Sequence, residues 1–202
     1  MELRRAIETR RMTRDFAETE VADDLVAELV DLASRAPSAG KTQGWSLLVL
    51  RDDARRQFWD LSLPADKREG FAWPGLLRAP VVALSFADPD AYVARYSEAD
   101  KAHTGLGVGV DKWGAPYWTI DASMATMTLL LAAHDAGLGA LFFAVFNGAD
   151  EIRRHFGVPD SLQLLGAVAL GHPASATRDE RRGVSASRPR RRANDIIHPN
   201  RW

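Results

Sequence analysis

The pattern of apolar and polar positions predicts an amphipathic helix over residues 21–36. Its apolar side chains recur at three- and four-residue spacing and therefore share one helical face: Leu25, Leu29, Leu32 and Ala36. Two aspartates begin the helix, where its dipole favours negative charge, and Pro37 ends it.

Short apolar runs bounded by glycine, proline or aspartate predict buried strands. These runs are residues 45–50, 80–86, 140–146 and 162–171. Shorter helices are predicted for residues 1–9, 53–62 and 149–157, and another from Pro89. Residues 63–79 and 97–116 are rich in glycine or proline and are expected to be irregular loops. The uneven alternation of helices and strands is typical of a layered α+β or α/β protein, with one domain over residues 1–202.

Residues 117–137 form the longest predicted helix, and it is apolar nearly all round. Such a helix is expected to be buried on most faces. It is either the central core helix or is partly buried against a second copy of the chain, and the two interpretations are compatible. Gly137 and Gly139 are expected to supply its C-cap and the turn that follows.

Composition and charge are those of an ordinary globular protein. Lysine and arginine together number 26 against 27 aspartates and glutamates, so the formal net charge is −1. Proteins that bind DNA usually have a clear basic excess, so we expect no nucleic-acid partner. The absence of cysteine excludes disulfides and thiolate chemistry. No apolar run approaches the roughly 18 residues of a membrane span, and the charged N-terminus lacks a signal-peptide core. We therefore expect a cytoplasmic protein without a membrane partner.

Several classes of enzyme find no support in the motifs. The five histidines lack the spacing of a helical metal site, so no metal is expected, and no G-x-S-x-G elbow of a hydrolase occurs. The glycines of residues 104–110 lack the G-x-G-x-x-G spacing of a dinucleotide-binding loop. They favour a flexible lid.

Two arginine clusters, one near each end of the chain, are the best candidates for binding an anion. The first contains Arg10, Arg11 and Arg14, and the second contains Arg188, Arg190, Arg191 and Arg192. The planar arginine side chain suits bidentate contact with phosphate oxygens. Either cluster alone is compatible with a solvated charged turn. The apolar residues that follow the second cluster indicate a packed segment, so the two clusters are expected to converge on one phosphate.

Residues 36–45, APSAGKTQGW, form the second candidate site. Pro37 ends a helix, and the small residues after it let a flat group approach the backbone closely. Gln43 adds both a donor and an acceptor. The stretch is either a loop for a planar polar ligand or a tight helix-to-strand turn.

Taken in order, these features resemble the FMN-dependent nitroreductase family. The shared blocks are an arginine-rich turn followed by Phe, the A-P-S-A-G-x-x-Q-G-W stretch, a buried helix ending in G-L-G, and R-P-R-R before a C-terminal tryptophan. They cover roughly residues 5–202. The resemblance implies a three-layer α+β fold around a mostly antiparallel sheet. It also implies a homodimer built on helix 117–137, two FMN sites at the dimer interface, and a C-terminal strap, about residues 183–202, that crosses onto the partner subunit.

The resemblance also assigns cofactor contacts. It places Arg10, Arg11, Arg14, Arg188 and Arg190 at the FMN phosphate, with Met12 at a position where the family often has serine. It places Pro37, Ser38 and Ala39 against the isoalloxazine ring, Lys41 and Gln43 near its polar edge or the ribityl chain, and Leu138, Gly139 and Ala140 on the other side near N5. The family often has asparagine where this chain has Lys41. This lysine either stabilises a reduced, anionic flavin or turns into solvent.

The implied activity is hydride transfer from NADH or NADPH through flavin N5 to an acceptor such as a nitroaromatic or a quinone, in a ping-pong exchange. No side chain is expected to act as a catalytic acid or base. The candidate substrate walls are four aromatic residues in or next to the two irregular segments: Trp73, Tyr96, Trp113 and Tyr117. Other chemistries of the same fold remain alternatives, namely dehydrogenation with oxygen, dehalogenation or flavin fragmentation. A flavin-binding protein without turnover is another.

Overall fold

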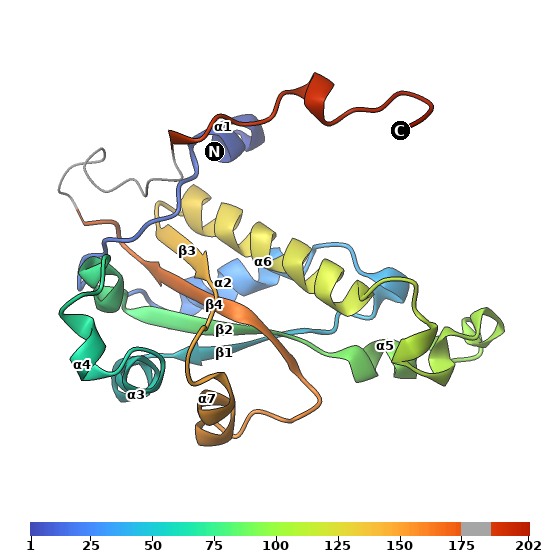
Figure 1. Cartoon of the computed structure of the whole chain (residues 1–202), viewed down its shortest axis with the longest axis horizontal. Helices are drawn as coiled ribbons and strands as arrows, with labels where there is room; N and C mark the ends of the chain where they lie inside the picture. Colours follow the sequence, from blue (N-terminus) through green and yellow to red (C-terminus); the bar gives the residue numbers. More distant parts are fainter. Residues whose placement is uncertain (175–186) are drawn as a thin grey trace.

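The computed structural model describes residues 1–174 and 187–202. Its strands form one sheet: β1 (Trp45–Leu50), β2 (Val81–Ala87), β3 (Gly139–Phe143) and β4 (Gln163–Gly171). Its α-helices are α1 (Leu3–Thr9), α2 (Asp23–Ala33), α3 (Asp52–Ser62), α4 (Ala65–Arg68), α5 (Pro89–Tyr96), α6 (Tyr117–Asp135) and α7 (Ala149–His155). Figure 1 shows helices on both faces of the sheet, which confirms the three-layer α+β fold.

The sheet has the order β1-β2-β4-β3, and every neighbouring pair is antiparallel. Strand β2 is buried along its whole length. Because side chains of a strand alternate between its two faces, β2 sends Val82, Leu84 and Phe86 into one core and Val81 into the other. Because helices cover both faces of the sheet, the stretches predicted to be strands are apolar on both faces.

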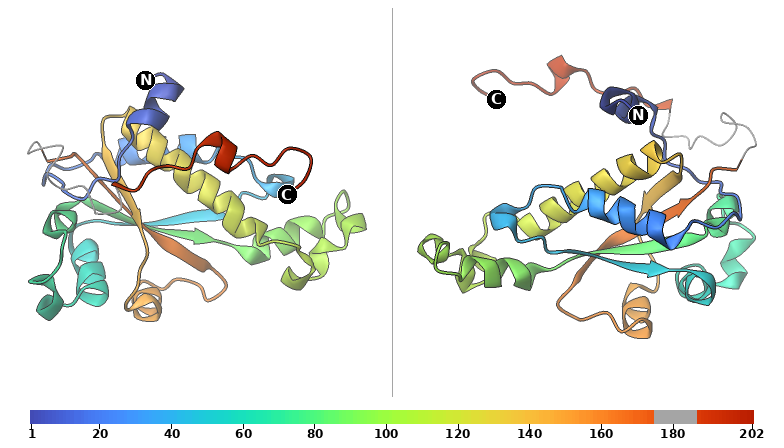
Figure 2. Two further views of the ribbon diagram at one scale, coloured as in Figure 1. Left: turned by 45° about the horizontal axis from the view of Figure 1, so that its top comes forward. Right: turned by 180° about the vertical axis from the view of Figure 1, so that it is seen from behind.

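One face of the sheet carries α2 and α6, which lie side by side (Figure 2). Their core includes Leu29 of α2 and Leu129 of α6. The other face carries α3 and α7, whose core includes Phe58 and Ile152. This arrangement makes α6 the long element that spans the sheet from one end to the other (Figure 1).

The predicted apolar face of α2 was partly wrong. The residues that α2 buries are Val26, Leu29 and Ala33, whereas Leu32 is 42% exposed. Both sets fit helical spacing, and contact with α6 selects the face on which a small residue, Ala33, allows the two helices to approach closely.

Helix α6 is less completely buried in one chain than its composition suggested. Four of its apolar side chains are between 36% and 43% exposed: Tyr117, Ile120, Met124 and Met127. Their three- and four-residue spacing places them along one stripe. The interpretation that part of α6 is buried against a second copy stays a prediction.

Other differences concern the ends of elements. Strand β3 begins at Gly139 and ends at Phe143, so Gly139 lies in the sheet and not in the preceding turn. Gly137, with φ of 79°, ends α6 in the left-handed conformation, as predicted. Segment 63–79 contains α4 and a 3₁₀ turn, and segment 97–116 contains three 3₁₀ turns.

Among the described residues, no helix has both the length and the apolar character needed to cross a bilayer. The same residues contain no cluster of three or more acidic, histidine or cysteine side chains suited to a metal ion.

Candidate functional site

The N-terminal arginine cluster is held against the start of β3. Met12 pairs with Ala140 in a parallel bridge, and the backbone N–H of Thr13 donates to the carbonyl of Ala140 at 2.9 Å. A Cβ at Gly139 would lie 2.6 Å from the hydroxyl oxygen of Thr13, so glycine is required for this close approach. The structure thus brings together residues 10–14 and 138–140, two groups that the sequence analysis assigned to one site.

Arg10 lies at the centre of this region with unsatisfied donors. Its Nε and Nη1 atoms are buried, and no described residue accepts a hydrogen bond from them. Burial lowers the pKa of Arg10, and the positive charges of Arg190 and Arg11 lower it further. Of the second cluster, Arg190 therefore lies near enough to Arg10 to affect its charge. Buried, unpaired guanidinium donors among like charges fit a bound phosphate, which would accept these hydrogen bonds and neutralise the charge.

The other cluster arginines differ in their surroundings. Arg11 is exposed and donates from Nη1 to the carbonyls of Glu8 and Arg10 at 2.8 and 2.9 Å. Arg14 lies over the ring of Trp73, with its guanidinium carbon 5.1 Å from the ring centroid. Arg188 is exposed, as is every residue from 187 to 202. The first residues of the expected strap, 183–186, lie outside the described residues.

Loop 37–43 contains the second group of predicted residues. The N–H of Ala39 donates to Oδ2 of Asp121 at 2.7 Å, and the N–H of Gln43 donates to the hydroxyl of Ser38 at 3.0 Å. Lys41 and Gln43 both have a φ of 56°, in the left-handed region. That conformation costs about 1–2 kcal/mol for a residue with a Cβ, so surrounding contacts must hold it.

A cleft of about 680 Å³ adjoins this loop. It lies between the end of α2 and the loop itself, and it is lined by Asp31, Ser34, Arg35, Ala36, Pro37, Ser38, Lys41 and Gln43. The interpretation of APSAGKTQGW as a loop for a planar polar ligand stays a prediction, and the loop borders an open cleft.

Three of the four predicted wall residues form an aromatic cluster beside the loop. The Trp113 ring lies 4.7 Å from that of Tyr96 and 5.8 Å from that of Tyr117. Trp113 also donates from Nε1 to the carbonyl of Leu106 at 3.1 Å, which folds segment 97–116 back on itself. The segment around Trp73 lies at the opposite end of the sheet, beside Arg14 (Figure 1).

The structure therefore divides the predicted residues between the two ends of α6. Loop 37–43 is bonded to Asp121, near the start of α6, and the arginine cluster meets β3 just after its end. A helical rise of about 1.5 Å per residue separates Asp121 from Asp135 by about 20 Å. Within one chain, the residues predicted for one site therefore lie in two separate groups, the arginine cluster and loop 37–43, which we call the two half-sites.

Sequence reasoning missed the residues that hold loop 37–43. Asp121 is only 6% exposed, and its Oδ2 accepts from the Tyr92 hydroxyl at 2.8 Å as well as from Ala39. Arg95 donates to the carbonyl of Gly40 at 2.9 Å. A signal was present for Asp121, because a lone carboxylate inside a helix apolar on all sides needs a buried partner.

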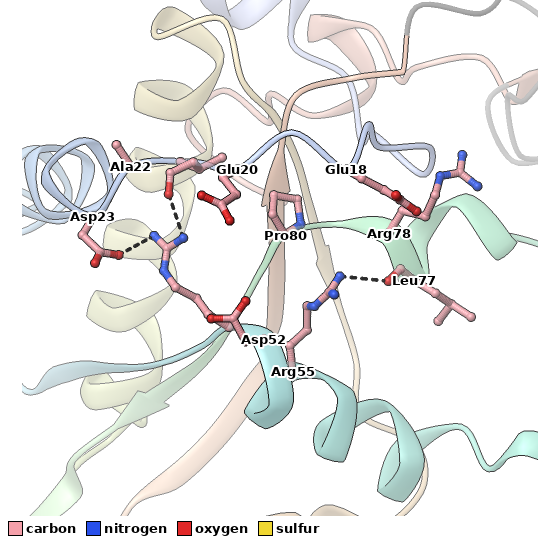
Figure 3. Close-up of a pocket in the computed structure, with 11 residues that line it drawn as sticks. Glu18, Glu20, Ala22, Asp23, Asp52, Arg55, Leu77, Arg78 and Pro80 are labelled. Atoms are coloured by element: carbon pink, nitrogen blue, oxygen red, sulfur yellow. Dashed lines mark hydrogen bonds and ion pairs between the residues drawn. The ribbon is translucent and has the colours of Figure 1, made fainter.

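A second cleft, of about 400 Å³, lies on the side of α3 and is drawn in Figure 3. Its arginines donate mainly to backbone carbonyls: Arg51 to Val21 at 2.7 Å, and Arg55 to Leu77 and Ala79 at 3.3 and 2.9 Å. Carboxylates line the same cleft (Figure 3). These contacts brace the segment before α2 and the turn before β2 against α3, and none of the predicted site residues lies here.

Comparisons with known proteins bear on the family and the fold of the chain. A sequence profile of the nitroreductase family matches residues 7–172. A relative from Archaeoglobus fulgidus, named as a candidate NADH dehydrogenase/NAD(P)H nitroreductase, is 27% identical over 97% of this chain and 96% of its own. The 4-nitrobenzoate reductase of Pseudomonas putida is 25% identical over 95% of this chain and 92% of its own. The crystal structure of a nitroreductase family protein from Clostridium novyi is similar in fold, with a TM-score of 0.66 and 24% identity over 87% of each chain.

Proposed function

The chain belongs to the nitroreductase family, and on that premise we propose that it is an FMN-dependent oxidoreductase. NADH or NADPH is the donor, and a small molecule such as a nitroaromatic or a quinone is the acceptor, by ping-pong exchange. The names of the relatives support an NAD(P)H-linked reductase. The observation that carries the assignment of FMN is Arg10, whose buried donors lack an acceptor in the described part of the chain.

The chain's own residues supply the binding and orientation of FMN. Arg10, Arg14, Arg188 and Arg190 would hold the phosphate, with Arg11 and Met12 beside it. Residues 138–140 would approach the ring from one side, and Pro37, Ser38, Ala39, Lys41 and Gln43 from the other. When bound, FMN supplies the hydride-transfer chemistry, and the protein contributes position and electrostatics. The aromatic cluster of Tyr96, Trp113 and Tyr117 would shield the site from water and contact the acceptor.

A complete site requires a second copy of the chain. The two half-sites lie at opposite ends of α6, and α6 presents an exposed apolar stripe between them. A homodimer that pairs two α6 helices in opposite directions would place the arginine cluster of one chain beside loop 37–43 of its partner. The same assembly would give the exposed tail, with Ile196, Ile197 and Trp202, an apolar surface to cover.

Flavin reduction tests this proposal directly. The purified protein should show the visible absorption of bound FMN, and anaerobic NADH or NADPH should bleach it. Adding a nitroaromatic or a quinone should then restore the absorption. A protein that neither carries nor takes up FMN contradicts the proposal. A protein that binds FMN but is bleached by neither nicotinamide is a flavin-binding protein without this turnover.

A further inference from the structure

Arg95, in the last turn of α5, contacts two segments that the chemistry needs together. From Nε it donates to the carbonyl of Gly40, inside loop 37–43, at 2.9 Å. Its terminal nitrogens donate to both carboxylate oxygens of Asp100, at 2.7 and 2.8 Å, and to Glu98 at 3.1 Å. One guanidinium thus joins the loop to the beginning of segment 97–116.

Segment 97–116 depends on this first turn for its position. The hydroxyl of Ser97 donates to the carbonyl of Gly107 at 3.0 Å. A Cβ at Gly107 would lie 2.5 Å from the Ser97 backbone nitrogen, so the segment folds back tightly onto its own start. Trp113 then packs on Tyr96, the residue next to Arg95. Displacement of the chain just after α5 would therefore loosen the contacts of Ser97 with Gly107 and of Tyr96 with Trp113.

Loop 37–43 is held by the same helix. Tyr92, one helical turn before Arg95, shares Asp121 with the N–H of Ala39. A Cβ at Gly40 would lie 2.9 Å from the Tyr96 ring, so α5 also contacts the loop directly. Helix α5 therefore holds the loop directly at Gly40 and, through Asp121 of α6, at Ala39.

Arginine is the side chain that can make these contacts at once. Its five N–H donors lie in a fixed plane and can serve a carbonyl on one edge while meeting a carboxylate bidentately on another. The hydrogen bond from Arg95 lowers the pKa of Asp100 to about 2. A lysine is a single point of charge and cannot span both partners.

We propose that Arg95 is a positioning residue that couples loop 37–43 to segment 97–116. A ligand that orders the loop then also orders segment 97–116, which places Trp113 between Tyr96 of α5 and Tyr117 of α6, and the acceptor site closes only around a loaded cofactor site. The identity of that ligand as FMN rests on the function proposed above, whereas the coupling itself does not.

Hydrogen–deuterium exchange of the full-length chain tests the coupling without any ligand. Asp100→Asn removes the charged partner of Arg95 in segment 97–116 and touches no residue of loop 37–43. Exchange in peptides covering residues 37–43 should nevertheless rise about fivefold, because the loop loses part of its support. The amides of Lys41 and Gln43, bonded to Ser38, are the reporters. Arg56→Gln, which breaks an exposed ion pair with Asp53 on α3, is the matched control and should leave the loop unchanged.

Addition of FMN gives the second readout. In the wild type, FMN should slow exchange in both peptides 37–43 and 97–113. In Arg95→Gln and in Arg95→Lys, saturating FMN should slow exchange in peptide 37–43 alone. In the same variants, KM for the acceptor should rise about fivefold while the rate of flavin reduction by the nicotinamide is retained. Unchanged loop exchange in Asp100→Asn, or full protection of 97–113 in Arg95→Gln, would overturn the coupling. If FMN protects neither segment of the wild type while Asp100→Asn still loosens the loop, the coupling stands and the flavin function fails.

Discussion

Replacing Arg10 by methionine should have opposite effects on FMN binding and on the stability of the free protein. Methionine retains much of the aliphatic stem of arginine, so the packing around residue 10 is largely preserved. The substitution removes two buried donor atoms that no described residue satisfies. It also removes a buried charge whose pKa is lowered first by burial and then by repulsion from Arg190 and Arg11.

The magnitudes follow from hydrogen-bond energetics. Each hydrogen bond to a charged group contributes about 1.5–3 kcal/mol, so loss of one such contact to phosphate should weaken FMN binding about 10- to 150-fold. In the ligand-free protein, an unsatisfied buried donor costs about 1–3 kcal/mol. Removing that cost should raise the melting temperature by about 2–4 °C for each kcal/mol relieved in a chain of this size.

Fluorescence titration with FMN and with riboflavin, together with thermal melts of the ligand-free protein, measures both effects. Riboflavin lacks the phosphate, so its affinity for Arg10→Met should match the wild type. Arg11→Met is the matched control and should weaken FMN less, because Arg11 is exposed and donates to backbone carbonyls. The assignment of Arg10 to the phosphate is refuted if Arg10→Met loses FMN and riboflavin affinity equally, or holds FMN as tightly as the wild type.

Further expectations concern α6, the loop and pH. Met124→Glu combined with Met127→Glu places charge in the exposed stripe of α6 and should give a monomer that loses FMN. Sedimentation measures the oligomeric state and absorption measures the flavin content, and a variant that remains dimeric contradicts the paired-helix assembly. Asp121→Ala leaves two donors unpaired and should lower the free energy of unfolding by about 2–4 kcal/mol in urea titrations, with Asp121→Asn intermediate. Equal stability of the wild type and both variants would show that Asp121 does not anchor loop 37–43. Burial, then the charges of the first arginine cluster, lower the pKa of His134 below 6.5, so the stability present above pH 6.5 should be lost as pH falls through the folded-state pKa; His134→Gln should flatten that dependence in unfolding titrations. Lys41→Asn removes a positive charge from the expected polar edge of the ring and should lower the flavin midpoint potential by about 20 mV, whereas an unchanged potential means that Lys41 faces solvent.

The sequence alone predicted the four strands and the longer helices because their signals are local, whereas it missed the short helix α4 and the 3₁₀ turns. Apolar runs between glycine and proline predict buried strands wherever helices cover both faces of the sheet. Gly137 predicted the end of α6 because a left-handed C-cap favours glycine whatever surrounds it. The convergence of the two arginine clusters on one phosphate stays a prediction, supported by the effect of Arg190 on Arg10.

Only the tertiary structure decided how those elements are combined into a site. Nothing in the spacing of residues shows that the arginine cluster and loop 37–43 lie at opposite ends of α6, or that Trp73 sits with Arg14 while Tyr96, Trp113 and Tyr117 gather elsewhere. The constant rise per residue of a helix sets the distance between the arginine cluster and loop 37–43 once the contacts at each end of α6 are known. Gly139, Asp121 and Arg95 have roles set by contacts between residues far apart in the chain, with the hydroxyl of Thr13, the N–H of Ala39 and the carbonyl of Gly40. Such contacts are decided by packing, and a one-dimensional pattern does not record them.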